Sequence, residues 1–232
     1  MIKIKPCLDC ESLPLPTIQT FLFGGGIIYI FLDYDGTLIK NDEDEFQKYY
    51  FSSFLKYSKL EKKIIDIVLE CTIELIKKDD DKITNLEYFM NLMEEKTGKD
   101  SMYWYNIFLD FYNTEFPKLK SIIKPNDKLI NKIKYSNHKF IFASNPLFPE
   151  IAVKHRIEFI NLKTNDFIYI STMENSHYCK PNENYFNEII YKLNIKPEDC
   201  LMIGDTDFDR ECIKAGINFI HVSEENIWEE IL

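Results

Sequence analysis

Two aspartates separated by one residue are the clearest candidates for chemistry in this sequence. Asp33 and Asp35 stand in the run DYDGT at 33–37, directly after an apolar stretch. Carboxylates at positions i and i+2 of an extended segment point the same way. One of them can attack phosphorus, while the other protonates the leaving oxygen and later activates water. Gly36 permits a tight turn and a close approach of the backbone.

The same run has an alternative reading as an acidic turn, because D-x-D-G also occurs in calcium-binding loops. An EF-hand loop, however, needs a closing glutamate at about the twelfth position and lies between two helices. Here an apolar segment typical of a buried strand leads into the run. The pattern therefore favours a catalytic pair over a calcium loop.

Three further clusters follow other apolar segments. Ser144 and Asn145 offer a hydroxyl and an amide that can hold a phosphoryl oxygen, although Ser-Asn-Pro also caps a helix. Lys180 could neutralise a nucleophile and phosphoryl oxygens, although most lysines are solvated surface residues. Asp205 and Asp209 would form a hard oxygen site suited to Mg²⁺, or else an acidic first turn of a helix that needs no metal.

Apolar strand-like segments alternate with helical patterns in the second half of the chain, and one such segment also precedes the first aspartate. Alternation of this kind predicts an α/β fold with a parallel sheet covered by helices on both faces. The expected strands are 27–32, 139–143, 167–170, 200–203 and 218–222. The expected helices between and around them are 126–136, 148–160, 183–193 and 207–215.

A separate helical region lies between the first two expected strands. Apolar residues recur at three- and four-residue spacing in 44–58, 60–77, 85–97 and 102–114. A crossover between neighbouring parallel strands needs little more than about a dozen residues, far fewer than this stretch contains. We therefore expect an insert of about four helices that emerges at the carboxyl edge of the sheet, where ligands bind.

Composition limits the partners of the protein. The 232 residues carry a net charge of −10, which argues against nonspecific binding of nucleic acid or of an anionic membrane. Any phosphorylated substrate must then be attracted by a bound cation or by a few placed lysines. Cys7 and Cys10 form a CxxC without a second metal-binding pair, as expected of incidental thiols in a reducing cytosol. The apolar run 21–32 contains three glycines and is too short to span a bilayer, so we expect a cytoplasmic protein.

Taken in order along the chain, the four clusters resemble the motifs of the haloacid dehalogenase superfamily of phosphohydrolases. DYDGT at 33–37 matches the first motif, Ser144 the second, Lys180 the third, and GDTDFD at 204–209 the fourth. The resemblance covers 27–222. The first and fourth motifs are specific, and the middle two gain weight only from their context.

This resemblance implies a role for each matched residue. Asp33 would be the nucleophile and Asp35 the general acid and base, while Ser144 would bind the phosphoryl group and Lys180 would orient and neutralise it. Members that dehalogenate lack the second aspartate, so the presence of Asp35 favours phosphoester chemistry. The resemblance also implies a Rossmann-like core at 27–40 and 118–232, with 41–117 as a helical cap and 1–26 as an extra leader.

Mg²⁺ is the cofactor that the resemblance implies. It would be held by the side chains of Asp33 and Asp205 and by the backbone carbonyl of Asp35, with Asp209 as a further ligand or as a support for the others. Asp207 lies outside the matched positions and is expected at the surface.

We expect a phosphatase that acts on a small phosphorylated metabolite. A phosphomutase shares the motifs, and a non-catalytic module that binds a phospholigand or a protein is a third reading, against which the intact aspartates weigh. Nothing in the sequence fixes the oligomeric state. The insert is rich in aromatic residues, which we expect mainly to pack between helices, the alternative being a pocket for an apolar substrate moiety. They are Tyr49, Tyr50, Phe51, Phe54, Tyr57, Tyr88, Phe89, Tyr103, Trp104, Tyr105, Phe108, Phe111 and Tyr112.

Overall fold

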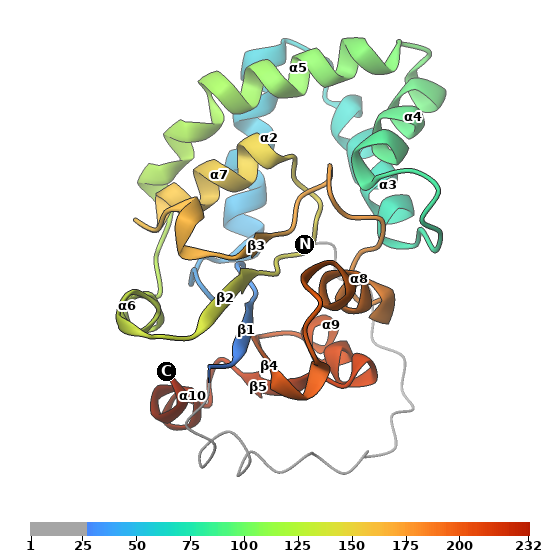
Figure 1. Ribbon diagram of the computed structural model, residues 1–232. Coiled ribbons are helices and arrows are strands. Elements are labelled where there is room, and N and C mark those ends of the chain that lie inside the picture. Colours follow the sequence, from blue (N-terminus) through green and yellow to red (C-terminus); the bar gives the residue numbers. More distant parts are fainter. Residues whose placement is uncertain (1–26) are drawn as a thin grey trace.

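The computed structural model describes residues 27–232, and its centre is a parallel sheet of five strands (Figure 1). The expected leader, with Cys7 and Cys10, lies outside the described residues. The strands lie in the order β3-β2-β1-β4-β5, so the first strand of the chain is the central one. Their bounds are β1 (Tyr29–Leu32), β2 (Lys139–Phe142), β3 (Tyr169–Ile170), β4 (Cys200–Gly204) and β5 (Asn218–His221).

The three central strands end level with one another. Leu32 at the end of β1 is in register with Phe142 of β2 and with Ile203 of β4. The pairing continues one residue further, because the Asp33 amide donates to the Ile203 carbonyl at 3.1 Å. Since all three strands are parallel, the residues that follow them meet at the carboxyl edge of the sheet.

Helices cover both faces of the sheet, as the alternating sequence pattern predicted. Apolar residues of one face pack with α6 (Asp127–Tyr135), α7 (Glu150–Phe159) and α10 (Glu225–Ile231). The other face packs with α8 (Glu183–Leu193) and with the 3₁₀ helix η4 (Glu211–Ala215), which follows the short α9 (Asp207–Arg210). The expected α/β fold with a parallel, doubly covered sheet is confirmed.

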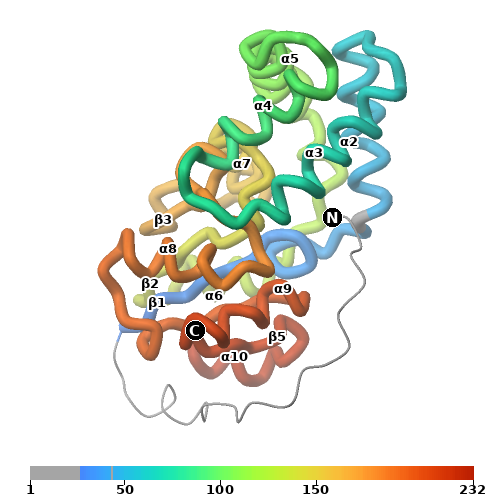
Figure 2. The backbone as a smooth tube through the Cα atoms, turned by 90° about the vertical axis from the view of Figure 1, so that its right-hand side faces the viewer, coloured from blue at the N-terminus to red at the C-terminus, as the bar shows by residue number. Residues whose placement is uncertain are grey.

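Four helices form the insert between β1 and β2. They are α2 (Glu43–Ser58), α3 (Lys63–Ile76), α4 (Asn85–Thr97) and α5 (Ser101–Thr114), and Figures 1 and 2 place them together at one end of the molecule. Local signals fix their ends: Thr84 and Glu87 form a capping box at the start of α4, and Asp100 caps α5. Gly98 ends α4 in the left-handed conformation at a φ of 68°.

Helix α7 lies between the sheet and the insert (Figure 1). Val153 and Ile157 pack in the cluster that covers the sheet, whereas Ala152 and Phe159 belong to the apolar cluster of the insert. A helix that buries residues on both sides joins the two parts of the molecule through one rigid element.

Several element bounds differ from the sequence expectation. The strand expected at 167–170 is reduced to Tyr169–Ile170, and the helix expected at 207–215 is a single α-turn followed by η4. The 3₁₀ helix η1 (Phe116–Ile122) and α10 were not expected at all. Short 3₁₀ segments of this kind depend on tertiary packing more than on a repeating apolar pattern.

Candidate active site

The site is built around Asp33, the first residue after the central strand. Its side chain is buried, with 6% of the residue exposed, and its Oδ1 accepts a hydrogen bond from Lys180 Nζ at 2.7 Å. Lys180 comes from the segment between β3 and α8, and it is also buried, at 2% exposed. The same ammonium donates to Asp209 Oδ1 at 2.5 Å. One buried cation therefore joins carboxylates that follow two adjacent strands.

Asp209 is held from both of its oxygens. Oδ1 pairs with Lys180, and Oδ2 accepts from the Thr206 hydroxyl at 2.7 Å and from the amides of Asp205 and Thr206. Thr206 and Asp209 form a reciprocal capping box at the start of α9. Gly204 allows this arrangement, because a Cβ there would lie 2.5 Å from the Asp209 Cβ. Asp209 thus caps a helix and fixes Lys180 at once.

Asp205 differs from Asp209, because its buried Oδ1 has no hydrogen-bond partner among the residues described. An unpartnered buried carboxylate oxygen is costly unless a cation or another ligand binds it. Gly36, at a φ of +76°, makes room for this side chain, because a Cβ at Gly36 would lie 2.0 Å from Asp205 Oδ2. The turn after β1 and the turn after β4 are therefore shaped to bring Asp205 beside the first motif.

Electrostatics reflect this crowding. Burial raises the pKa of Asp33 well above its usual range, Lys180 opposes the shift, and Asp209, Asp35 and Asp205 add to it. Burial, with a contribution from Asp209, raises the pKa of Asp205 to about 6. Burial lowers the pKa of Lys180, but Asp209 and Asp33 outweigh it and the net shift is upward. The site holds more negative charge than its lysine neutralises.

Asp33, Asp205 and Asp209 offer carboxylate oxygens that all lie within 4.8 Å of one another. Such a set of oxygen donors fits a hard divalent cation, and the unpartnered Asp205 Oδ1 supplies an oxygen ready to bind one. The side chain of Asp35 is not part of this group. Asp207 is exposed, as expected from its place outside the matched motif positions.

Asp35 instead forms an ion pair with Arg156 of α7. Arg156 was not among the site residues expected from the sequence. Arg156 is 2% exposed, and its guanidinium carbon lies 4.1 Å from the centre of the Tyr34 ring and 4.7 Å from that of Phe148. The Tyr34 hydroxyl donates to the Arg156 carbonyl at 2.8 Å. Two aromatic rings and one carboxylate therefore fix this arginine in place.

A sequence signal for Arg156 exists but is weak on its own. The arginine falls at helical spacing with Ala152 and Val153 and next to Ile157, all of which are buried in α7. A charged residue on the apolar stripe of a helix is unusual and indicates a buried partner. Which partner it finds is a matter of tertiary structure.

Ser144 and Asn145 follow β2 at the same edge of the sheet and are both buried. The Asn145 side chain accepts from the Lys180 amide at 3.0 Å and donates to the Lys180 carbonyl at 3.1 Å. Both of its polar atoms thus hold the backbone of the lysine, which favours a positioning role over the phosphate contact that we expected. The Ser144 carbonyl accepts from the Tyr185 hydroxyl at 3.1 Å.

The family of the chain follows from a comparison with family models. Residues 29–222 match the model described as haloacid dehalogenase-like hydrolase, which is most of the chain. The chain belongs to the haloacid dehalogenase-like hydrolases, in agreement with the order of its four motifs. A search of curated proteins found no match.

Solved structures share the fold at low sequence identity. An enzyme of this family from Bacteroides thetaiotaomicron, in complex with magnesium and inorganic phosphate, is 19% identical, with a TM-score of 0.50 over 84% of this chain and 94% of that one. A 2-haloacid dehalogenase from Pseudomonas syringae pv. Tomato is 13% identical, with a TM-score of 0.56 over 84% and 86% of the two chains. A putative β-phosphoglucomutase from Thermotoga maritima is 17% identical, with a TM-score of 0.52 over 89% and 100%.

A 2-haloacid dehalogenase and a putative β-phosphoglucomutase share this fold, so the likeness establishes the architecture alone. In the described part of the chain, 27–232, no helix combines the length and the apolar character that a membrane span requires.

The two aspartates of the first motif are predicted to affect stability in opposite directions. In metal-free buffer at pH 7.5, Asp35→Asn should lower the free energy of unfolding by about 1–3 kcal/mol, because Arg156 loses its carboxylate partner. Asp33→Asn should raise it. The pKa of Asp33 is higher in the folded protein than in the unfolded chain. The free energy of unfolding therefore falls as the pH rises above the pKa that Asp33 has in the unfolded chain. A neutral amide does not ionise, so Asp33→Asn avoids this loss of stability.

Urea unfolding followed by circular dichroism measures both variants. Asp207→Asn is the matched control, since Asp207 is exposed, and it should stay within about 0.5 kcal/mol of the parent. Equal losses in Asp33→Asn and Asp35→Asn would contradict the charge distribution described above.

Proposed function

We propose that this protein is a Mg²⁺-dependent phosphomonoester hydrolase that forms an aspartyl-phosphate on Asp33. The observation that carries the proposal is the position of Asp33. It is a buried carboxylate at the end of the central strand, contacted by Lys180 and grouped with Asp205 and Asp209. Membership in the haloacid dehalogenase-like hydrolases supports this reading. The related enzyme solved with magnesium and inorganic phosphate supports the class of ligand.

Asp33, Asp205 and the backbone carbonyl of Asp35 would hold the metal, with Asp209 close by. When bound, Mg²⁺ supplies positive charge that offsets the repulsion between a phosphate dianion and a carboxylate nucleophile. Lys180 supplies a second positive charge, at 2.7 Å from Asp33 Oδ1. Asp209 and Asn145 keep Lys180 in place through its side chain and its backbone.

The reaction proceeds in two steps. Asp33 attacks phosphorus, and the bond from phosphorus to the ester oxygen breaks. Asp35, which enters this step carrying a proton and not as the ionised partner of Arg156, gives that proton to the leaving oxygen. Asp35, now ionised, takes a proton from a water molecule that attacks the acyl phosphate. Phosphate leaves, and Asp33 and Asp35 return to their starting states. Ser144, buried beside this site after β2, is the residue that we assign to the phosphoryl oxygens.

The helical insert has a role in this proposal as a cap. Exclusion of water strengthens every charge interaction in such a site and protects the acyl phosphate from side reactions. A phosphomutase would use the same residues but return the phosphoryl group to a second substrate. Release of inorganic phosphate without a bisphosphate activator separates the two activities. Location in the cytoplasm stays a prediction from the sequence.

Asp33→Asn should abolish steady-state release of phosphate from acetyl phosphate, because an amide cannot form the acyl phosphate. The expected loss is at least about 10⁴-fold, as for other groups that act covalently. Asp207→Asn, an exposed change of the same type within the fourth motif, should keep its rate within about twofold of the parent. A colorimetric phosphate assay measures both. Normal turnover by Asp33→Asn would show that another group is the nucleophile.

Magnesium should also stabilise the fold, which gives a test that does not depend on turnover. At a hundred times its dissociation constant, a ligand of the native state adds about 2.7 kcal/mol, or roughly 5–10 °C in Tm for a chain of this size. Asp205→Asn should lose most of that increase, because it removes the negative charge and replaces one oxygen of the carboxylate whose Oδ1 has no partner among the described residues.

Differential scanning fluorimetry with and without Mg²⁺ gives the result, and Asp207→Asn should respond like the parent. An equal increase in Tm for Asp205→Asn and the parent would remove Asp205 from the metal site.

A further inference from the structure

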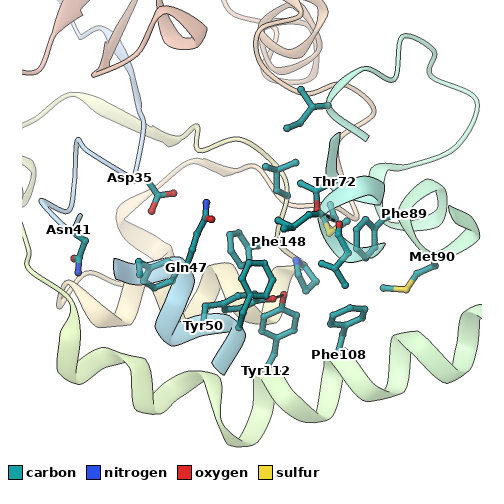
Figure 3. Close-up of a pocket in the computed structure, with 18 residues that line it drawn as sticks. Asp35, Asn41, Gln47, Tyr50, Thr72, Phe89, Met90, Phe108, Tyr112 and Phe148 are labelled. Carbon is teal, nitrogen blue, oxygen red and sulfur yellow. Dashed lines mark hydrogen bonds between the residues drawn. The ribbon is translucent and has the colours of Figure 1, made fainter. Parts of the chain in front are cut away.

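We infer that the leaving group of the substrate is uncharged, largely apolar and about the size of one six-membered ring. This inference rests on the proposed function and adds the class of substrate to it. The observation behind it is a cavity between the helical insert and the loop that follows β2, of about 140 Å³, with Asp35 in its wall (Figure 3).

The cavity runs from Asp35 into the insert. In Figure 3, Asp35 lies at one end and Phe89 and Met90 at the other, with Tyr50, Tyr112 and Phe148 between them. A general acid must touch the oxygen that it protonates. The group attached to that oxygen therefore extends from Asp35 into the space that Asp35 lines.

The wall provides no positive charge for an anionic leaving group. None of the described residues that line the cavity is a lysine, an arginine or a histidine. Among the described lining residues Asp35 is the one acidic residue, and it faces Arg156, which is outside the lining. A leaving group with a carboxylate or a second phosphate would meet no cation here, so the cavity selects a neutral group.

Hydroxyl groups in the wall already have partners. Tyr50 and Tyr112 share a hydrogen bond of 2.8 Å, and the Thr72 hydroxyl donates to the Val68 carbonyl at 2.8 Å. Burial raises the pKa of Tyr50 to about 12, and it raises that of Tyr112 still further, so both rings stay neutral. A sugar in this space would exchange its bonds with water for contacts with aromatic rings. The cavity therefore discriminates against polyhydroxylated groups.

The volume of the cavity matches a small leaving group. An engineered protein cavity of about 150 Å³ that is lined by apolar side chains holds one benzene molecule. A cavity of about 140 Å³ is thus suited to one ring and not to a nucleoside.

Packing accounts for many of the insert's aromatic residues, as the sequence analysis expected. Phe54, Trp104 and Phe111 are buried in the cluster of the insert and do not line the cavity. Tyr50, Phe51, Phe89, Phe108 and Tyr112 line it. Packing between helices is therefore confirmed for the buried members of the set, and the residues that line the cavity are the ones that would contact substrate under this inference.

Two phosphates with the same ester bond test the inference on the unmodified protein. Cyclohexylmethyl phosphate and glucose 6-phosphate are both primary phosphomonoesters with a six-membered ring next to the ester carbon, and the glucose ring adds hydroxyls. We expect kcat/KM to be at least about a hundredfold higher for cyclohexylmethyl phosphate, since even one added hydroxyl can cost that much in an apolar pocket. Equal values, or a preference for the sugar, would overturn the inference.

A pair of variants in adjacent positions of α3 tests whether the leaving group lies in the cavity. Thr72 lines the cavity and Ile73 does not, so Thr72→Phe fills the space, whereas Ile73→Phe adds the same ring elsewhere. Thr72→Phe should lower kcat/KM for cyclohexylmethyl phosphate at least tenfold more than it lowers kcat/KM for acetyl phosphate. Ile73→Phe should change the ratio of the two by less than threefold. The same change of ratio in both variants would place the leaving group elsewhere.

Acetyl phosphate distinguishes a failure of the inference about the leaving group from a failure of the phosphatase proposal. Its leaving group has only two carbons and departs as a stable carboxylate, so it needs neither the cavity nor a proton from Asp35. Turnover of acetyl phosphate without a preference for the cyclohexyl ester would overturn the inference and leave the phosphatase proposal standing. Failure to turn over any of the three phosphates by folded protein with Mg²⁺ would overturn both.

Discussion

The concentration of negative charge at the end of the central strands is the constraint on which the rest of the structure depends. Asp33, Asp205 and Asp209 come within reach of one another because β1 and β4 are adjacent and end level. Within residues 27–232, Lys180 is the one cation in contact with two of them. Carboxylates in a buried setting repel one another and lose hydration, so the fold must supply both a counter-charge and rigid support.

Much of the structure around these carboxylates provides that support. Asn145 holds the Lys180 backbone from the end of β2, and the capping box of α9 holds Asp209 from the other side. Gly36 and Gly204 remove side chains that would otherwise collide with Asp205 and Asp209. Because these supports come from the ends of three strands, β1, β2 and β4, the complete site requires the assembled sheet. This explains why the residues involved are spread over the whole chain.

The sequence was sufficient for the parts of the site that lie directly after strands. Asp33 and Asp205 follow buried apolar runs, and residues at the carboxyl ends of parallel strands must share one edge. Register and strand order add precision but do not change that conclusion. The helices of the insert could also be predicted from the sequence, because their apolar spacing and their caps are local properties of the chain.

Arg156 and the cavity could not be found in the same way. The ion pair joins residues 121 positions apart, and the place of Arg156 among the buried residues of α7 indicates that it has a partner but not which one. The cavity is defined by what the aromatic rings of the insert leave unfilled, and composition cannot distinguish a packed ring from one that lines a space. Both features depend on tertiary packing. The ion pair depends on how α7 packs against the turn after β1, and the cavity depends on how the insert meets the loop that follows β2.

Arg156 connects the candidate active site with the cavity. Its carboxylate partner belongs to the first motif, and one of the two rings that enclose it, Phe148, also lines the cavity. A leaving group that contacts Phe148 would therefore touch a ring that stacks on the arginine paired with the proposed acid. Any shift of the insert that moves Phe148 must also disturb the surroundings of Asp35, because buried groups that pack tightly cannot move independently. In this arrangement, the apolar surface that selects the substrate is physically continuous with the group that would donate the proton.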